Sequence, residues 1–351
     1  MDLIILDPAN DLDKYFDLIG TYCNRADYQK AQEELDKIEP YCKTPADKAR
    51  FHYSRGYINY ATTSQLSALM EYRKGLREDP DDTMNLKGEC AYSRKLIKKE
   101  YEEMKRVVMN IIDLINQRYS KTSEDDKTKV DDRAFQLLLG FHQSIRLPRA
   151  DNLSLGFPND NLFLGFDDYF AKFTGEKQES AKRFLEEAYH ITDRESFFEC
   201  IHHNPNLDMN GYIGDAIAHL NDKPNFDVNA LDDDKKLSFL ATVEFVKSFK
   251  DYLPDAGVIA WDLSEQIGLV RIAFACDIIS EEDYCHSMSH LTDILKNRLS
   301  SFEEFARSFT FGSALLMFKV KSMNITKSTD FMFSVAGCLL MGTLLDTKWV
   351  K

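Results

Sequence analysis

The sequence predicts an all-α protein, with N-terminal helical hairpins followed by a C-terminal helical domain. Apolar residues recur at three-to-four spacing along much of the chain, and no run of alternating, β-branched residues predicts a strand. Several helix starts have the hydroxyl-then-acid spacing of a capping box, which favours a helix after each one. These starts are Thr192 with Glu195, Ser280 with Asp283, and Ser301 with Glu304.

Residues 11–80 contain two copies of a helix-pair repeat. The clearer, second copy has a small, small, aromatic, small, proline register at Gly56, Ala68, Tyr72, Gly75 and Pro80. This register resembles the tetratricopeptide repeat, an antiparallel helix pair. The first copy is degenerate: it places Tyr15, Leu18, Ile19 and Tyr22 on one helix, Asp27 and Tyr28 at the turn, and Ala31, Leu35 and Ile38 on the next helix.

The second copy begins with a strong helix start. Thr44 supplies a hydroxyl cap, Pro45 occupies the first turn, and Asp47 places an acid near the positive end of the helix dipole. Repeats of this type act mostly through a concave face. The candidate peptide-binding residues on that face are Tyr22, Asn59 and Tyr60.

The sequence pattern after Pro80 divides the chain into three regions. A long charged helix over about 84–119 is expected to cap the repeats, so that residues 1–120 form the repeat domain. The polar stretch at 121–131 predicts a linker, and residues 132–351 form the C-terminal helical domain. A helix over about 132–144 and a turn-rich segment at 147–168 open that domain; the segment is ordered by its Leu and Phe residues or covers a site.

Composition limits the partners and the compartment. The formal charge of −14 disfavours nucleic acid and anionic membranes. The seven cysteines are scattered and never spaced as C-x-x-C, which favours a reduced, cytoplasmic interior without a zinc knuckle. The N-terminus lacks a signal-peptide pattern. The uncharged stretch at 331–345 is shorter than the roughly 18 to 20 residues that span a bilayer, and predicts a buried core helix.

A core helix over about 258–276 carries the residues most in need of explanation. It is apolar nearly all round, yet it includes Asp262 and Arg271, which lie on opposite faces. A buried arginine needs an acid or a bound anion, and Glu282, Glu303 and Glu304 are candidate acids. One interpretation is a structural salt bridge with a tryptophan core; the other is an anion or substrate pocket built from Trp261, Asp262 and Arg271, with Glu282.

This region resembles the bacterial family called domain of unknown function 1266, over about 180–351. The resemblance is strongest at Trp261 and Asp262, at Arg271, at the ISEE start over 279–282, and at the SFEEFARS segment over 301–308. Where such sequences commonly carry an arginine, an asparagine and a glycine, this chain has Glu265, Gly268 and Asp277. The resemblance implies no established reaction.

Metal and catalytic signatures are weak. Glu282, His286 and His290 share one helix face, but no second cluster completes a metal site, so neither a metal nor a cofactor is expected. The loop at Asn206, Asp208, Asn210, Gly211 and Ile213 mimics a calcium loop but has Ile217 where the bidentate glutamate belongs. Nucleophile, P-loop and dinucleotide motifs are absent from the sequence, so the enzyme question stays open and leans toward no.

Three functions remain as hypotheses. The first is a cytoplasmic bacterial interaction or adaptor protein that binds a short segment of a protein partner through its repeats. The second is an enzyme or ligand-binding protein with an anion pocket at Trp261, Asp262 and Arg271. The third is an immunity or antitoxin protein, because high acidity suits a basic toxin. The oligomeric state is left open.

Overall fold

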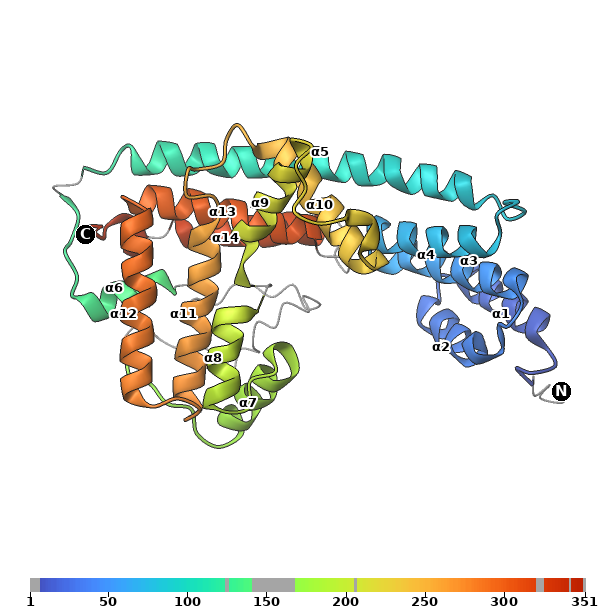
Figure 1. Ribbon diagram of the computed structural model, residues 1–351, viewed down its shortest axis with the longest axis horizontal. Helices are drawn as coiled ribbons and strands as arrows, with labels where there is room; N and C mark the ends of the chain where they lie inside the picture. The colour runs from blue at the N-terminus through green and yellow to red at the C-terminus, as the bar shows by residue number, and fades with distance from the viewer. Residues whose placement is uncertain are drawn as a thin grey trace. The chain divides into compact units, whose positions relative to one another are not determined.

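The all-α fold class is confirmed by the computed structural model, which describes residues 7–123, 126–140, 168–204, 207–319, 325–340 and 342–349 (Figure 1). Within these residues there is no β-strand, and one isolated bridge joins Thr128 to Thr347. The helices are α1 (Leu12–Asn24), α2 (Tyr28–Ile38), α3 (Pro45–Thr62), α4 (Gln65–Glu78), α5 (Leu86–Tyr119), α6 (Asp132–Leu139), α7 (Glu176–Tyr189), α8 (Arg194–His203), α9 (Met209–Leu220), α10 (Asp233–Phe249), α11 (Ile259–Ala275), α12 (Glu281–Arg298), α13 (Phe302–Lys319), α14 (Ile325–Leu339) and α15 (Gly342–Leu345).

The chain divides into two compact units. Unit 1 comprises Met1–Glu103 with Val320–Thr326, and unit 2 comprises Met104–Lys319 with Lys327–Lys351. The division falls inside α5, whereas the sequence places the boundary at 121–131. Part of that predicted linker is held in unit 2, because Thr128 donates its N–H to Asp346 and accepts from the N–H of Lys348 at 2.9 Å.

Unit 1 consists of two helix pairs and the first turns of α5. The first pair, α1 and α2, buries Ile19, Ala31, Leu35 and Ile38. In the second pair, α3 and α4 approach closely at Gly56, where any side chain would meet the ring of Tyr72. The predicted small and aromatic residues of the second copy therefore do face each other across the pair. Assignment of the pairs to the tetratricopeptide type stays a prediction.

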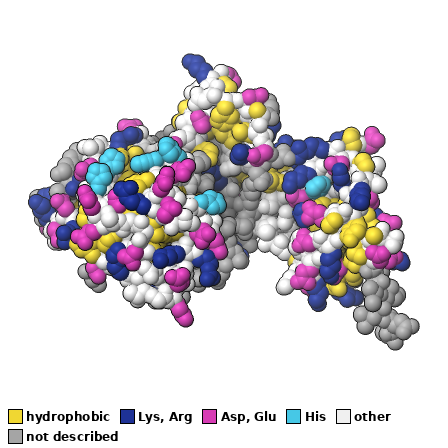
Figure 2. All heavy atoms as spheres, turned by 60° about the horizontal axis from the view of Figure 1, so that its bottom comes forward, with side chains coloured by type: hydrophobic (Ala, Val, Ile, Leu, Met, Phe, Trp, Pro, Cys, Tyr) yellow, Lys and Arg dark blue, Asp and Glu magenta, His cyan; other side chains and the backbone are white. Residues whose placement is uncertain are grey.

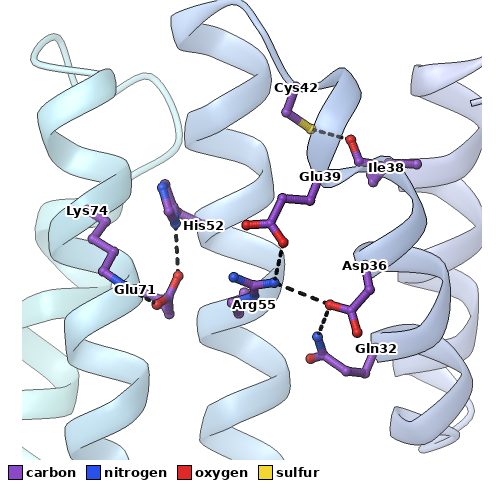
Figure 3. Close-up of polar contacts among 9 residues, drawn as sticks. All are labelled: Gln32, Asp36, Ile38, Glu39, Cys42, His52, Arg55, Glu71 and Lys74. Atoms are coloured by element: carbon purple, nitrogen blue, oxygen red, sulfur yellow. Dashed lines mark hydrogen bonds and ion pairs between the residues drawn. The ribbon is translucent and has the colours of Figure 1, made fainter. Parts of the chain in front are cut away.

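Polar contacts tie neighbouring helices of unit 1 together (Figure 3). Arg55 of α3 donates to Asp36 of α2 at 3.2 Å and to Glu39 at 3.1 Å. On the other side of α3, the buried Glu71 of α4 lies 2.8 Å from Nδ1 of His52 and 2.8 Å from the ammonium of Lys74. Although burial raises the pKa of Glu71, these two partners lower it below its ordinary value. Charged contacts thus link the first helix pair to the second through α2 and α3, and link the two helices of the second pair through α3 and α4.

Helix α11 forms the centre of unit 2. All its residues except Ile259 and Gln266 are buried, as the nearly uniform apolar pattern predicts. Helices α12 and α13 pack directly on it, and Figure 1 shows α13 crossing its first turns while α12 runs beside it. A charged or polar side chain on α11 therefore has to find its partner inside the protein.

The predicted helix starts fare differently. Thr44 and Ser280 are N-caps of complete capping boxes, with Asp47 and Asp283 respectively. The prediction at Thr192 is wrong by one residue, because Asp193 is the N-cap and pairs reciprocally with Ser196. Before α13, Ser301 accepts from the N–H of Glu304 at 3.1 Å, but the Glu304 carboxylate accepts from Ser300 instead.

Two further predictions concern the helices near the C-terminus and the segment before α7. The stretch at 331–345 is divided between α14 and α15, and Phe333 is 53% exposed, so this stretch is less uniformly buried than predicted. Within the described residues, no helix is both long enough and apolar enough to cross a bilayer. Except for Asp168, the turn-rich segment at 147–168 lies outside the described residues, as does the end of the helix predicted over 132–144.

Candidate functional site

Trp261 lies where α11 crosses α13. Its ring is buried, and its centroid lies 4.9 Å from that of Phe309. A Cβ atom at Gly312 would overlap the Cβ of Trp261, so glycine permits the close approach of the two helices. The Ser308 hydroxyl accepts the N–H of Ala260 at 3.0 Å, which satisfies one of the free donors at the start of α11. Trp261 therefore belongs to the contact between α11 and α13.

Asp262 is buried on another face of α11, where it caps the start of α9. One carboxylate oxygen accepts the N–H of Met209 at 2.9 Å, and the other accepts the N–H of Asn210 at 3.0 Å. These N–H groups have no acceptor within their own helix, and a carboxylate is favourable at the positive end of the helix dipole. Asp262 thus joins α9 to the central helix.

The start of α9 holds the start of α11 in return. Oδ1 of Asn210 accepts the N–H of Val258 at 2.8 Å, and its Nδ2 donates to the carbonyl of Ala256 at 3.2 Å. Between them, Gly257 has a φ of 63° and leaves no room for a side chain beside Asn210. The described part of the segment that mimics a calcium loop is therefore a helix start, with Asp208 as N-cap, and not a set of converging metal ligands.

Asp262 and two ionisable groups near it, Glu265 and Lys319, have shifted pKa values. Burial raises the pKa of Asp262 to about 7, against the effect of the two backbone N–H groups. Burial, and then repulsion from Asp262, raises the pKa of Glu265 to about 8. Lys319, at the end of α13, has a pKa lowered to about 8 by burial, which the Asp262 carboxylate partly offsets. Such a cluster is typical of functional sites, and also of buried structural networks.

We expect unit 2 to lose stability as pH rises from 5.5 to 8, and Glu265→Gln to reduce that loss by about 2 kcal/mol. The folded-state pKa of Glu265 lies above its ordinary value of 4.5, so folding is most favoured at low pH and the advantage disappears as pH approaches 8. Urea unfolding followed by tryptophan fluorescence measures this, because both tryptophans, Trp261 and Trp349, lie in unit 2. If the free energy of unfolding of the variant falls with pH as steeply as that of the parent chain, the raised pKa of Glu265 does not cause the pH dependence.

Arg271 is buried further along α11, where phenols surround it. Its guanidinium hydrogen-bonds the Tyr284 phenol, which in turn donates to the backbone carbonyl of Tyr169 at 2.8 Å. The phenol of Tyr169 donates to Gln136. Burial lowers the pKa of Arg271, and the two tyrosines partly counter this effect. Tyrosines of α12 and of the segment before α7 are thus among the partners of Arg271.

The acids predicted to pair with Arg271 lie elsewhere. Glu282 is exposed on the first turn of α12, where it acts on Arg194 of α8. Glu304 accepts from Ser300, and Glu303 acts on the phenol of Tyr119. Among protein side chains, the sequence predicted only acids as partners of Arg271. A tyrosine can take their place, because a phenol accepts a hydrogen bond from a guanidinium without carrying a charge.

One departure from the resembled family has a direct structural meaning. Asp277, where such sequences commonly carry glycine, is the second residue after α11 and has a φ of 60°, a conformation that favours glycine. Its carboxylate lies 2.9 Å from the ammonium of Lys172 and accepts from Gln178 at 2.9 Å, contacts that lower its pKa. In this chain the left-handed residue also ties the end of α11 to the segment that leads into α7.

The histidines of α12 do not form a metal site in the described part of the chain. His286 and His290 are exposed, and their rings stack with centroids 6.4 Å apart. Glu282 lies one turn earlier on the same helix and is also exposed. Among the described residues, no group of three or more potential ligands converges anywhere.

The structure does not bring the four predicted pocket residues together. Trp261 faces α13, Asp262 faces α9, Arg271 faces Tyr284, and Glu282 faces solvent. Asp262 lines a cavity of about 820 Å³ between the starts of α9 and α11, and the other three residues do not line this cavity. The sequence missed Lys319, whose only signal is a single basic residue at the end of the long apolar run of α13.

The predicted groove residues of unit 1 also lie in different surroundings. Tyr22 is half-buried against the core of the first helix pair, under the ammonium of Lys30. Asn59 is half-buried, and its carbonyl accepts from the N–H and hydroxyl of Thr63, both at 2.9 Å. Tyr60 is 38% exposed and lies between two other exposed tyrosines.

These three side chains, Tyr57, Tyr60 and Tyr92, form what we call the tyrosine row. Their exposed fractions are 37%, 38% and 49%, and the ring centroids are 6.3 Å apart from Tyr57 to Tyr60 and 6.3 Å apart from Tyr60 to Tyr92. A hydrogen bond links Tyr60 to Tyr92, so the row joins α3 to α5. Of the three, only Tyr60 was predicted as a binding residue, and Tyr92 belongs to a helix outside the repeat register.

Comparison with known proteins supports a relationship for the C-terminal part of the chain alone. No curated protein and no solved structure matches this chain. Residues 184–344 match the model of the family described as "Protein of unknown function (DUF1266)", which confirms the family resemblance of the region that contains α11.

Proposed function

We propose that this chain is an interaction protein, in which the tetratricopeptide-like helix pairs of unit 1 bind an extended, basic segment of a partner protein. The tyrosine row is the observation that carries the proposal. Exposed tyrosines provide large, rigid contact area at low entropic cost and are enriched among the residues that dominate binding energy. Three neighbouring rings on two helices offer a longer surface than a lone exposed aromatic residue does.

Charge next to the tyrosine row favours a basic partner. The Glu89 carboxylate acts on the phenols of Tyr53, Tyr60 and Tyr72, and within the described residues it forms no ion pair. Lysine and arginine side chains can pair with a carboxylate and also stack on tyrosine faces. On the face drawn in Figure 2, acidic and basic side chains are interspersed, so the net charge of −14 is not gathered in one patch there. The Glu89 carboxylate therefore indicates the charge of the partner better than the net charge of the chain does.

Two other functions from the sequence stay as alternatives. An immunity or antitoxin role is a special case of a basic protein partner and agrees with the same tyrosine row and carboxylate. A ligand-binding or enzymatic role for unit 2 is favoured by its cavity rather than by a pocket of Trp261, Asp262 and Arg271. A cytoplasmic, bacterial setting belongs to the proposal.

We expect the double variant Tyr60→Ala/Tyr92→Ala to lower recovery of the specific partner by about tenfold, since truncating two neighbouring anchor residues removes most of such a contact. The measurement is quantitative affinity capture from the native lysate with the full chain, followed by mass spectrometry. The matched control is Tyr252→Ala, which removes a tyrosine of unit 2 that is 45% exposed.

A second variant tests the charge of the partner. Glu89→Gln is expected to weaken capture, and capture by the parent chain is expected to fall with added salt, because salt screens the attraction between exposed charges. A partner that is retained by the tyrosine double variant, or lost equally in Tyr252→Ala, would rule out the tyrosine row as its binding surface.

A further inference from the structure

A second cavity adjoins the one beside Asp262, within unit 2. The larger cavity has a volume of about 820 Å³ and the smaller one of about 500 Å³. They share the segment 253–256, which follows α10, and the side chain of Arg298 at the end of α12. The two cavities are therefore parts of one concave region, in the size range of small-molecule sites.

The cations of this region are not neutralised by the protein itself. Lys250 lines the larger cavity, Arg307 lines the smaller one, and Arg298 lines both. None of the three forms an ion pair with the residues that the structure describes. By contrast, three of the four acids that line the cavities accept backbone N–H groups: Asp208 from Gly211, Asp262 from Met209 and Asn210, and Glu304 from Ser300. Asp255 is the remaining exposed carboxylate.

Arg307 indicates more specifically that an anion binds in this region. Its Nε atom is buried and has no hydrogen-bond partner within the described residues, although buried donors are nearly always satisfied. An arginine donor in this state at the wall of a cavity is typical of a site that an anion completes. Arg298 adds a second guanidinium, and the forked donors of arginine match the oxygens of phosphate groups.

The larger cavity indicates what the anionic group is attached to. Beside its polar groups, it is lined by Ile213, Ile217, Leu253 and Leu263. Ile217 is 41% exposed, so part of this lining is accessible to a ligand. These side chains offer an apolar surface next to the cationic end.

We propose that this region binds a small phosphate monoester, with the phosphate at Arg298 and Arg307 and the organic part in the larger cavity. This site is independent of the tyrosine row, so either proposal can fail alone. It is also distinct from the pocket that the sequence places at Trp261, Asp262 and Arg271, since Arg271 and Trp261 line neither cavity.

The test is calorimetric titration of the full chain with phenyl phosphate and with inorganic phosphate at low ionic strength. We expect phenyl phosphate to bind at least about tenfold more tightly, because only the ester fills the apolar part. Arg298→Gln and Arg307→Gln are each expected to weaken phenyl phosphate binding at least about tenfold. Arg118→Gln, an exposed arginine of α5 in unit 2 that has no ion pair within the described residues, should leave it unchanged.

Several outcomes would overturn the proposal. One is that the parent chain does not bind phenyl phosphate. Another is that it binds inorganic phosphate as tightly as phenyl phosphate, because the organic part of the ester would then contribute nothing to binding. Equal loss in Arg118→Gln would show that binding depends only on general charge. If Arg307→Gln does not fold, the exposed Arg298 carries the test, since replacing it disturbs no buried contact.

Discussion

Gly312→Ala is expected to destabilise unit 2 by about 3 kcal/mol. The added Cβ would overlap the Cβ of Trp261, and neither atom belongs to a flexible side-chain end that can turn away. The helices α11 and α13 would have to move apart, which would also disturb the hydrogen bond from Ala260 to Ser308. Urea unfolding, followed by the fluorescence of Trp261 and Trp349, measures the free energy of unfolding of this unit.

Gly337→Ala is the matched control for that variant. Gly337 lies within α14 and is exposed, and no atom lies within 4 Å of a Cβ built there. Because alanine is the better helix former, this variant is expected to gain up to about 1 kcal/mol. A loss in Gly312→Ala no greater than the effect of the control would show that α11 and α13 are not in close contact at Trp261.

The helices of this protein were predictable because each has a local signal. The capping boxes at Thr44 and Ser280 and the apolar pattern of α11 depend on residues within one or two turns of each other. The wrong helix start at Thr192 shows how narrow that information is: Asp193 and Ser196 cap equally well one residue later. The local sequence therefore predicted that a helix begins here but did not determine its first residue.

The candidate sites were harder to predict because they depend on contacts between distant segments. Asp262 was singled out as a charge on a buried helix, but the N–H groups whose hydrogen bonds it accepts belong to α9, 53 and 52 residues earlier in the chain. Arg271 was expected to meet an acid, and the structure places it against tyrosines. Tyr57 and Tyr60 are neighbours along α3, but Tyr92 joins them only when α5 packs on the second helix pair.

The family match and the geometry at Asp262 both indicate what Trp261 and Asp262 do in this chain. Residues 184–344 include α9, α11 and α13, which are the helices that Asp262, Trp261 and Gly312 hold together. The tryptophan and aspartate that carry the resemblance are therefore packing and capping residues in this chain. In contrast, the proposed phosphate ester site uses Arg298 and Arg307, which form no ion pair within the described residues.

Asp262→Ala is expected to destabilise unit 2 by roughly 3 kcal/mol, because it leaves the N–H groups of Met209 and Asn210 without their acceptor in a buried place. Asp262→Asn should cost less, since one amide oxygen can still accept. As a control, Asp131→Ala removes an exposed N-cap that accepts from Ala134 at 2.8 Å, and should cost about 1 kcal/mol. Urea unfolding at pH 6 separates the three variants. If Asp262→Ala and Asp131→Ala cost the same, Asp262 does not join α9 to α11 as inferred; if Asp262→Ala remains stable but loses phenyl phosphate binding, the aspartate belongs to the ligand site instead.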